Sequence, residues 1–368
     1  MRLAYLDWNA TAPLRPEAAA AMTESLALCG NPSSVHRFGR EARRALEAAR
    51  AQVAALIGAA AAAIVFTSGG TEANQLALRG VAGRRLLIAA IEHDSVRDAA
   101  PATVVPVTPQ GVVDLDALER MLAADPRPAL VSLMLANNET GVIQPVAEAA
   151  RLAHAHGALL HCDAVQAAGK LPLDVGRLGA DLLTLSAHKL GGPQGVGALV
   201  VVADVPLRAL QTGGGQERGR RAGTENLPGI VGFGVACAIA ARELDGYAAV
   251  ATLRDAAQRR LTAMVPEARV YGGNTARLPN TLCLAMPGVP AATQVMALDL
   301  AGVMVSAGSA CSSGKVRRSH VLDAMGVPAA AAESAIRISL GWSTTPADID
   351  QLAEAWGALY ARRRASAA

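Results

Sequence analysis

The stretch Ser186-Ala187-His188-Lys189-Leu190-Gly191-Gly192-Pro193 lies between two short apolar runs, and the organisation of the chain follows from it. Upstream, residues 180–185 predict a strand that ends at the serine, and downstream, residues 198–202 predict another strand. Burial and a neighbouring cation both disfavour the charged form of a lysine, and a neutral lysine amine attacks carbonyl groups to form a Schiff base. A surface lysine in a turn explains this segment equally well. The other motifs of the chain are therefore needed to distinguish a surface lysine from a Schiff-base lysine.

The composition limits the class of protein. The 368 residues suit two domains or one large α/β unit, and at 52% hydrophobic and 18% charged the chain can bury a sizeable core. A net charge of +3, with no basic tract interleaved with aromatic residues, gives no reason to expect nucleic acid as a partner. Residues 1–6 lack the apolar segment of a signal peptide, and residues 230–241 are too short for a membrane span. We therefore expect a cytoplasmic protein that does not contact a membrane.

The five cysteines form no CxxC pair and lie far apart, at positions 29, 162, 237, 283 and 311. This spacing indicates neither a zinc site nor a disulfide framework. The run His161-Cys162-Asp163 contains three residue types that bind metals, but adjacent residues of a strand point to opposite faces. The sequence therefore predicts no metal site.

Between residues 64 and 202, apolar strands alternate with helices. Strands are predicted at 64–67, 85–90, 104–107, 130–135 and 158–162, and helices from 71, from 94, and at 115–124 and 146–156. Because these strands are apolar without strict alternation, we expect a mostly parallel sheet covered by helices on both faces. A turn at 9–13 and an amphipathic helix at 41–57 precede this region.

The pattern changes after Gly229. A long helical region at 227–263 leads to strands at 280–286, 303–306 and 335–340, and to helices at 291–300 and from about 347. We interpret this second set of elements as a smaller α+β domain. The expected organisation is a large domain at 14–250 and a small domain formed by 1–13 and 251–368.

Polar clusters follow several of the predicted strands, and in parallel sheets ligands bind beyond the carboxyl ends of the strands. Residues 68–74 open a helix with glycines and hydroxyls, which suits a phosphate, although an ordinary N-cap explains them equally well. His93 is either structural or placed to stack on a ring and carry protons. Asp163 would keep a protonated ring nitrogen charged. Together with Lys189, these are the parts that a pyridoxal phosphate enzyme needs.

Cys311 lies in a segment, 306–315, made mostly of small residues and glycines. A thiol of ordinary pKa, about 8.5, is slightly ionised at neutral pH and strongly nucleophilic. Alone, this segment favours a passive surface cysteine. Beside the other motifs, Cys311 is a candidate nucleophile.

The sequence resembles cysteine desulfurases of the NifS/IscS type, in the class V aminotransferase group of fold-type I pyridoxal phosphate enzymes. The motifs that carry the resemblance run nearly from end to end: Tyr5-Leu6-Asp7, Gly30-Asn31-Pro32-Ser33-Ser34-Val35-His36, Phe66-Thr67-Ser68-Gly69, Asn137-Asn138-Glu139, Asp163-Ala164-Val165-Gln166, Ser186-Ala187-His188-Lys189, Gly213-Gly214-Gly215-Gln216-Glu217, Arg221-Ala222-Gly223-Thr224-Glu225-Asn226 and the segment around Cys311. The resemblance implies an α/β fold with a seven-stranded, mostly parallel sheet sandwiched by helices, beside the smaller α+β domain.

The resemblance also implies roles around the cofactor. Lys189 would form the Schiff base with pyridoxal phosphate and then act as the base at the substrate α-carbon. Asp163 would pair with the pyridinium nitrogen, and His93 would stack on the ring. Gln166 and Asn138 would contact the ring oxygen.

Further roles concern the phosphate and the substrate. The phosphate would be held by Gly70, Thr71, Ser186 and His188. Thr224 of the partner subunit would join them, which implies a homodimer. Arg337 would bind the carboxylate of the substrate, as a bidentate arginine does well.

The implied reaction removes sulfur from L-cysteine, giving L-alanine and a persulfide on Cys311 that passes to a sulfur acceptor such as an Fe–S scaffold protein. Two alternatives are a selenocysteine lyase on the same scaffold and a pyridoxal phosphate-binding sulfur-relay protein that does not turn over. The joint presence of the lysine, aspartate, histidine, cysteine and arginine argues against the relay protein. Residues 315–318 replace a stretch that usually contains Glu-Pro, which leaves the acceptor open. Trp8 and Ala12 also depart from the family pattern, and we expect changed local packing there.

Overall fold

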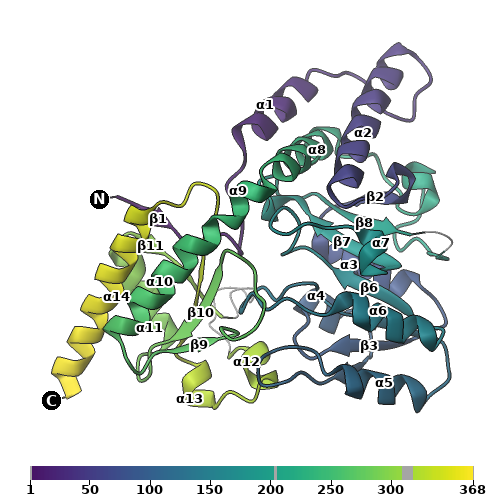
Figure 1. Ribbon diagram of the computed structural model, residues 1–368. Coiled ribbons are helices and arrows are strands. Elements are labelled where there is room, and N and C mark those ends of the chain that lie inside the picture. Colours follow the sequence, from purple (N-terminus) through teal and green to yellow (C-terminus); the bar gives the residue numbers. More distant parts are fainter. Residues whose placement is uncertain (1, 203–204, 309–317, 368) are drawn as a thin grey trace.

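The computed structural model describes residues 2–202, 205–308 and 318–367. Figure 1 shows a seven-stranded sheet with its helices beside a smaller group of strands that is covered by the helices α10 (Val250–Met264), α11 (Ala291–Leu300) and α14 (Pro346–Ala367). The predicted α/β class is confirmed. The predicted domain boundaries, 14–250 against 1–13 with 251–368, stay a prediction.

The central sheet contains, in spatial order, β2 (Ile64–Thr67), β8 (Gly197–Val201), β7 (Leu182–Ser186), β6 (Leu159–Asp163), β5 (Ala129–Ser132), β3 (Arg85–Ala89) and β4 (Thr103–Val105). Neighbours from β7 to β4 are parallel, whereas β8 is antiparallel to both β7 and β2. The connection from β7 to β8 is short, residues 187–196, and a parallel crossover needs roughly a dozen residues or more. The mostly parallel sheet is therefore confirmed, with one reversed strand.

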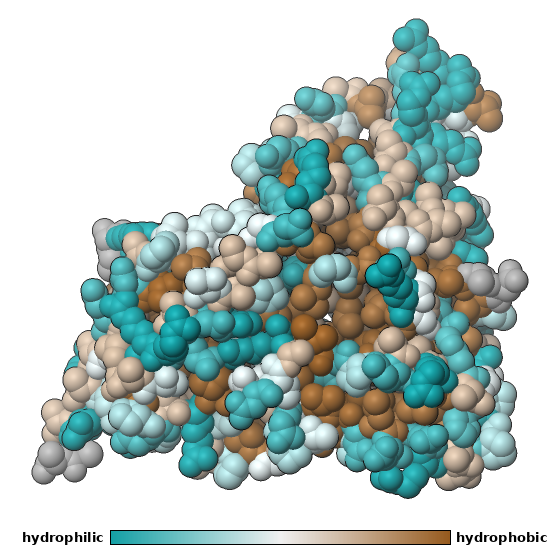
Figure 2. Space-filling view, in the orientation of Figure 1, coloured by the Kyte–Doolittle hydropathy of each residue, from teal (hydrophilic) through white to brown (hydrophobic). Residues whose placement is uncertain are grey.

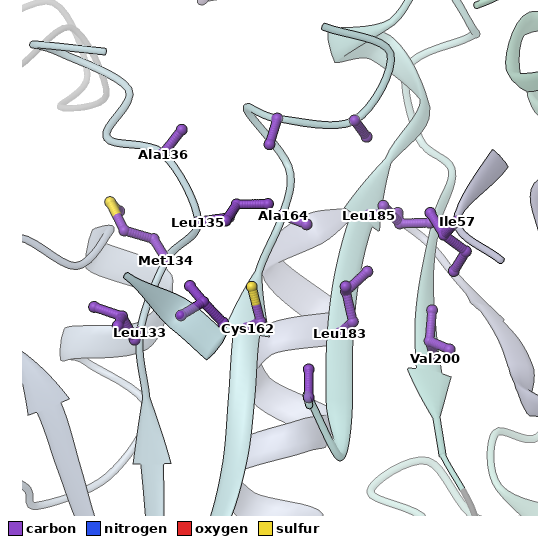
Figure 3. Close-up of a cluster of buried hydrophobic side chains, with 14 of the residues drawn as sticks. Ile57, Leu133, Met134, Leu135, Ala136, Cys162, Ala164, Leu183, Leu185 and Val200 are labelled. Atoms are coloured by element: carbon purple, nitrogen blue, oxygen red, sulfur yellow. The ribbon is translucent and has the colours of Figure 1, made fainter. Parts of the chain in front are cut away.

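Both faces of the central sheet are buried. Leu182 and Leu183 are adjacent on β7 and point to opposite faces, yet both are fully buried. Figure 3 shows one of the two clusters, in which Cys162, Leu183 and Val200 from three neighbouring strands lie on the same face. The other face packs against α3 (Gly70–Gly80). This two-sided burial explains why the strand sequences are apolar without alternation.

Helices cover the sheet close to the predicted positions. α5 (Leu115–Ala123) and α6 (Val146–Ala155) match within one residue, whereas α4 (Asp94–Arg97) is a single turn. α2 (Arg37–Leu56) begins before the predicted start because His36 caps it, accepting from Gly39 N.

The predicted helical region 227–263 is divided into α8 (Leu227–Arg242), α9 (Leu244–Ala248) and α10. α1 (Pro16–Ser25), which the sequence analysis left unassigned, packs with α2 against α8 (Figure 1).

The smaller group of strands forms two sheets. An antiparallel sheet has the order β12 (Ser306–Ala307), β13 (Ala335–Ser339), β10 (Thr281–Ala285) and β9 (Arg269–Tyr271). A parallel pair joins β1 (Ala4–Tyr5) to β11 (Val303–Met304). The start of the chain therefore pairs with a strand about three hundred residues later, and this pairing brings residues 7–11 beside the central sheet. Three short helices complete the fold: α7 (Val175–Leu178), α12 (His320–Ala324) and α13 (Ala329–Ala332).

Among the described residues no single helix is long and apolar enough to span a bilayer, and only α8 taken together with residues 244–264, after a bend of 70°, meets that test. Figure 2 shows hydrophobic residues gathered in the middle of one face, over the central sheet, with hydrophilic residues around them.

Candidate active site

A cavity of about 390 Å³ opens where the parallel strands of the central sheet end. The structure brings ten of the predicted site residues to its wall: Gly70, Thr71, His93, Asn138, Asp163, Gln166, Ser186, His188, Lys189 and Arg337. The wall also contains residues to which the sequence analysis gave no role: Asn9, Ala10, Asn74, Ser95, Met134, Ala136 and Val165. Side chains from distant parts of the chain thus meet at one place.

The N-terminus of α3 forms one end of this cavity. Gly70 and Thr71 are in its first turn, where backbone N–H groups have no partner within the helix. A Cβ on Gly70 would lie 3.0 Å from Cγ2 of Val165 and 3.5 Å from Cβ of Ser186, so a larger residue would narrow the space at the end of β7. N–H groups at a helix start, next to the Ser186 hydroxyl, form a site suited to a phosphate or another anion.

His188 lies at the same end of the cavity. Burial and the neighbouring Lys189 lower the pKa of His188 to about 4, so its ring is neutral at neutral pH. Its Nδ1 lies 3.2 Å from Oγ1 of Thr11. A neutral imidazole can still donate a hydrogen bond to an anion from one ring nitrogen.

Asp163, the last residue of β6, is a buried carboxylate held by N–H donors. Oδ1 accepts from Val165 N at 2.9 Å, and Oδ2 accepts from Nδ2 of Asn74 at 2.8 Å. None of the ion pairs in the described part of the chain includes Asp163. A buried carboxylate that faces a cavity in this way suits a ligand with a protonated nitrogen, because an opposite charge stabilises the ionised form.

A hydrogen-bonded chain connects Asp163 to His93. Nδ2 of Asn74 also donates to Oγ of Ser95 at 2.9 Å, and this Oγ lies 2.8 Å from Nδ1 of His93. The backbone N–H of Ser95 donates to the same Nδ1 at 3.1 Å. Because this nitrogen accepts, the neutral ring of His93 carries its proton on Nε2. The chain therefore fixes both the orientation and the tautomer of His93.

Glu92, directly before His93, is a second carboxyl group close to Asp163. It is fully buried, and Oε1 accepts from Met134 N at 2.6 Å. Burial, with a smaller contribution from the negative charge of Asp163, raises the pKa of Glu92 to about 8. Glu92 is therefore mainly protonated at neutral pH.

Lys189 ends the short 3₁₀ turn Ala187–Lys189 that follows β7. Its Nζ donates to the carbonyl oxygens of Asn9 and Ala10, each at 2.7 Å. Gly191, two residues on, has φ +89°, and a Cβ there would lie 2.7 Å from Trp342. This close approach explains the glycine after Lys189, since the loop has to fold tightly against its neighbours.

Asn9, expected from the sequence only as part of a turn, lines the cavity and contacts Lys189. Besides Lys189, its carbonyl oxygen accepts from Nε2 of Gln166 at 3.0 Å. Its Nδ2 donates to the carbonyl oxygen of Asn138 at 3.2 Å and to Oγ1 of Thr281 at 2.9 Å. The signal was available in principle, because Asn9 is a polar residue in the turn that follows the short apolar opening of the chain.

Trp8 departs from the family pattern, and the changed local packing expected there stays a prediction. Its ring is buried and meets Trp342 edge-on at 4.5 Å between centroids. Its Nε1 donates to the carbonyl oxygen of Tyr5 at 3.0 Å. Ala12, the other departure, is buried too.

Arg337 reaches the cavity from β13 and is 2% exposed. Nη2 donates to Oδ1 of Asp7 at 2.8 Å, and Nη1 donates to the carbonyl oxygen of Asn138 at 3.1 Å. Within the described part of the chain its Nε has no partner. A guanidinium has five N–H donors, so donors remain for a carboxylate in the cavity.

Thr224 and Cys311 do not join this group. Thr224 lies in the wall of a separate cavity, with Ser68 and Arg221. Cys311 falls outside the described residues. Described residues on the two sides of Cys311 in the sequence nevertheless meet one side chain: the Ser319 hydroxyl donates to Glu139, and a Cβ on Gly308 would lie 2.8 Å from the same carboxylate.

The donor set fits pyridoxal phosphate. The start of α3 provides N–H groups for a phosphate, and Asp163 is a buried anion with no cation of its own among the described residues. Lys189 supplies an amine and Gln166 an amide at the same wall. The described residues contain no group of three or more His, Cys, Asp or Glu that could hold a metal.

Comparisons with known proteins agree with this chemistry. Residues 4–352 match the family model described as aminotransferase class-V. The chain is 48% identical to a cysteine desulfurase of Cereibacter sphaeroides, over 96% of this chain and 95% of that protein. It is 42% identical to the cysteine desulfurase IscS of Dictyoglomus turgidum, over 95% of this chain and 92% of that protein. Its fold matches the crystal structure of a NifS-like protein from Rickettsia africae with a TM-score of 0.92 at 36% identity, over 98% of this chain and 99% of that one.

Proposed function

This chain belongs to the class-V aminotransferase family, and from that membership we propose that it is a cysteine desulfurase that uses pyridoxal phosphate. The observation that carries the proposal is the convergence of Lys189, Asp163 and Arg337 on one cavity. An amine, a buried anion and a buried cation are the three groups needed to hold a cofactor aldehyde, its ring nitrogen and an amino-acid carboxylate. The high identity to cysteine desulfurases over nearly the whole chain supports sulfur removal as the reaction.

When bound, pyridoxal phosphate withdraws electrons from the substrate α-carbon and so weakens the bonds around it. Lys189 would hold it covalently, and Asp163 would keep its ring nitrogen protonated. Its phosphate would lie against the start of α3 at Gly70 and Thr71, with Ser186 and His188. The ring oxygen would face Gln166 and Asn138, whose side chains line the same wall.

Lys189 and His93 are the groups placed to move protons. The amine of Lys189 takes the proton from the substrate α-carbon, which requires its neutral form. His93 carries a proton on Nε2, because Nδ1 accepts from Ser95. We infer that its ring stacks on the cofactor ring while it can donate that proton within the cavity. Buried Asp163, through Asn74 and Ser95, keeps the imidazole in this orientation.

Cys311 is the proposed sulfur acceptor within the chain. Its thiolate attacks the sulfur of L-cysteine, so that an S–S bond forms as the Cβ–S bond breaks, and protonation of the carbon gives L-alanine. The persulfide then passes to an acceptor protein such as an Fe–S scaffold. The position of Glu139, beside described residues on the two sides of Cys311 in the sequence and next to Asn138 of the cavity wall, supports access of Cys311 to the substrate.

We further infer a cytoplasmic homodimer. Thr224 does not line the candidate active site of its own chain but a separate cavity, which supports a role in the phosphate site of a partner subunit. Arg221, close to it, donates to Glu72 in the first turn of α3, so this segment is fixed beside the phosphate end. Large exposed apolar side chains near α1 and α2 offer contact surface: Leu26, Leu28, Val35 and Phe38. The described cysteines are all free, as expected in a reducing compartment.

The proposed function is tested by supplying the cofactor-loaded protein with L-cysteine or L-selenocysteine and measuring alanine. We expect alanine from L-cysteine. Alanine from L-selenocysteine alone would identify a selenocysteine lyase instead. If neither substrate gives alanine although the cofactor is bound, the relay protein is the alternative that remains, and the proposal is contradicted.

Arg337→Lys is expected to raise the KM for L-cysteine by roughly 10- to 100-fold, because a lysine cannot reproduce the bidentate, charge-assisted contact to a carboxylate. The cofactor should still bind, since Arg337 has no proposed contact with it. Steady-state kinetics and the visible spectrum check both points. Arg254→Lys is the matched control, because Arg254 is also buried but lies on α10 and donates to the carbonyl oxygen of Leu278. An unchanged KM for the Arg337 variant would contradict the assignment.

A further inference from the structure

Lys170 is a second buried lysine beside the cavity, and the proposed function does not use it. It is one of only three lysines in the chain, with Lys189 and Lys315. Its side chain is 5% exposed and does not line the cavity. It forms no ion pair with a carboxylate in the described part of the chain. Its Nζ donates instead to two amide oxygens, Oε1 of Gln166 at 3.0 Å and Oδ1 of Asn9 at 3.1 Å.

Lys170 and the carbonyl oxygen of Asn9 together fix which way the Gln166 amide is turned. An ammonium group only donates, so the amide atom that faces Lys170 has to be the oxygen. Nε2 is then on the opposite side, where one of its hydrogens goes to the carbonyl oxygen of Asn9 at 3.0 Å. The second hydrogen remains for the cavity that Gln166 lines.

The protonation state of Lys170 does not change this result. Burial, and then the positive charges of Lys189 and Arg337, lower the pKa of Lys170 well below its ordinary value. A neutral amine still has two hydrogens, one for each of the two amide oxygens, although its lone pair can also accept. The carbonyl oxygen of Asn9 only accepts, so Nε2 of Gln166 faces it and Oε1 faces Lys170 in either state.

Asn9 is fixed in the same way. Its Oδ1 accepts from Lys170 and also from Nδ2 of Asn280 at 3.0 Å, so its Nδ2 is turned toward Asn138 and Thr281. The backbone carbonyl of Asn9 in turn accepts from Lys189. Lys170 therefore orients the two amide side chains that border the cavity on this side.

We propose that Lys170 is a positioning residue that fixes the Gln166 amide so that Nε2, and not Oε1, faces the ring oxygen of the cofactor. The inference rests on the proposed cofactor site. A donor stabilises this oxygen when it is negatively charged, whereas the amide oxygen in the same place would repel it. Lys170 thus acts on the cofactor through Gln166, without touching it.

The test is a pH titration of the visible absorption band of the cofactor-loaded protein. In Lys170→Met, which keeps the length of the side chain but removes the donors, Oε1 of Gln166 loses the donor that holds it away from the cavity. Only the hydrogen bond from Nε2 to the carbonyl oxygen of Asn9 then opposes rotation of the amide. We expect the midpoint to rise by about one pH unit. A shift of this size corresponds to the free energy of about one hydrogen bond to a charged group. The rise occurs because loss of the donor favours the protonated form of the chromophore. Lys170→Arg keeps N–H donors and should restore the midpoint toward that of the unchanged protein.

A double variant separates this role from a general effect on packing. Gln166→Leu alone should raise the midpoint, and adding Lys170→Met to it should give little further change, because both act on one contact. Full addition of the two shifts would overturn the proposal. So would a Lys170→Met protein that titrates like the unchanged protein.

A second variant covers the case in which Lys170→Met does not fold. Gln166→Glu keeps an oxygen for Lys170 but removes the Nε2 donor, so its midpoint should also rise, and an unchanged midpoint would overturn the proposal. Thermal melting without cofactor reports on folding for each variant. Failure of the proposed cofactor site looks different, since the unchanged protein would then show no cofactor band at all, and failure of the desulfurase activity would leave this titration unchanged.

Discussion

Lys189→Ala is expected to stop the formation of alanine from L-cysteine, with turnover lower by about 10⁴-fold or more, the upper range for loss of a positioned acid–base group. The variant loses both the covalent hold on the cofactor and the base at the substrate α-carbon. The variant removes the two hydrogen bonds from Nζ to the carbonyl oxygens of Asn9 and Ala10, and the carbonyl of Asn9 keeps Gln166 as a donor. Thermal melting checks that the variant is folded.

Reduction with borohydride in the presence of pyridoxal phosphate, followed by peptide mass spectrometry, checks this result. With only three lysines in the chain, the labelled position is unambiguous. We expect the label on Lys189 in the unchanged protein and in Lys170→Met, and none in Lys189→Ala. A label on Lys170 would contradict the assignment, since that lysine lies within the same hydrogen-bond network.

Cys311→Ser is expected to abolish persulfide formation while cofactor and L-cysteine still bind. The other cysteines support this choice by exclusion. Cys162, Cys237 and Cys283 are buried, and burial raises the pKa of each thiol above its ordinary value. A thiol that is both buried and un-ionised is a poor nucleophile. Only Cys29 is exposed among the described cysteines.

Cys29→Ser is therefore the matched control for Cys311→Ser. The control should form persulfide and alanine at the rate of the unchanged protein. The visible spectrum on addition of L-cysteine shows whether the Cys311 variant still binds its substrate. Normal sulfide release by Cys311→Ser, or its loss in Cys29→Ser, would refute the role given to Cys311.

The sequence predicted most strands because they are apolar runs bounded by polar turns. β2 matches at both ends, and the polar residues after β3, β6 and β7 do meet in one cavity. Their proximity was predictable because the carboxyl ends of parallel strands lie at the same edge of a sheet. The reversed β8 was also open to prediction, since its connection to β7 is too short for a parallel crossover.

The contacts between distant segments were not open to prediction in this way. Asn9 belongs to the site because β1 pairs with β11, a pairing that no local pattern encodes. The roles of Asn74 and Ser95 depend on the hydrogen-bonded chain to His93. The helical pattern of 227–263 gave no break, whereas the structure divides it at Glu243 and Ala249. Burial of Lys170 against amides is equally a result of tertiary packing.

The central claim is that sulfur is removed from L-cysteine in this one cavity and is transferred to Cys311. The most direct measurement is a single turnover of the cofactor-loaded protein with L-cysteine and no reductant, in which alanine is quantified and the protein is analysed by peptide mass spectrometry. The account predicts one added sulfur atom per alanine formed, located on the peptide that contains Cys311. Sulfur on another cysteine, or free sulfide released with pyruvate in place of alanine, would contradict it.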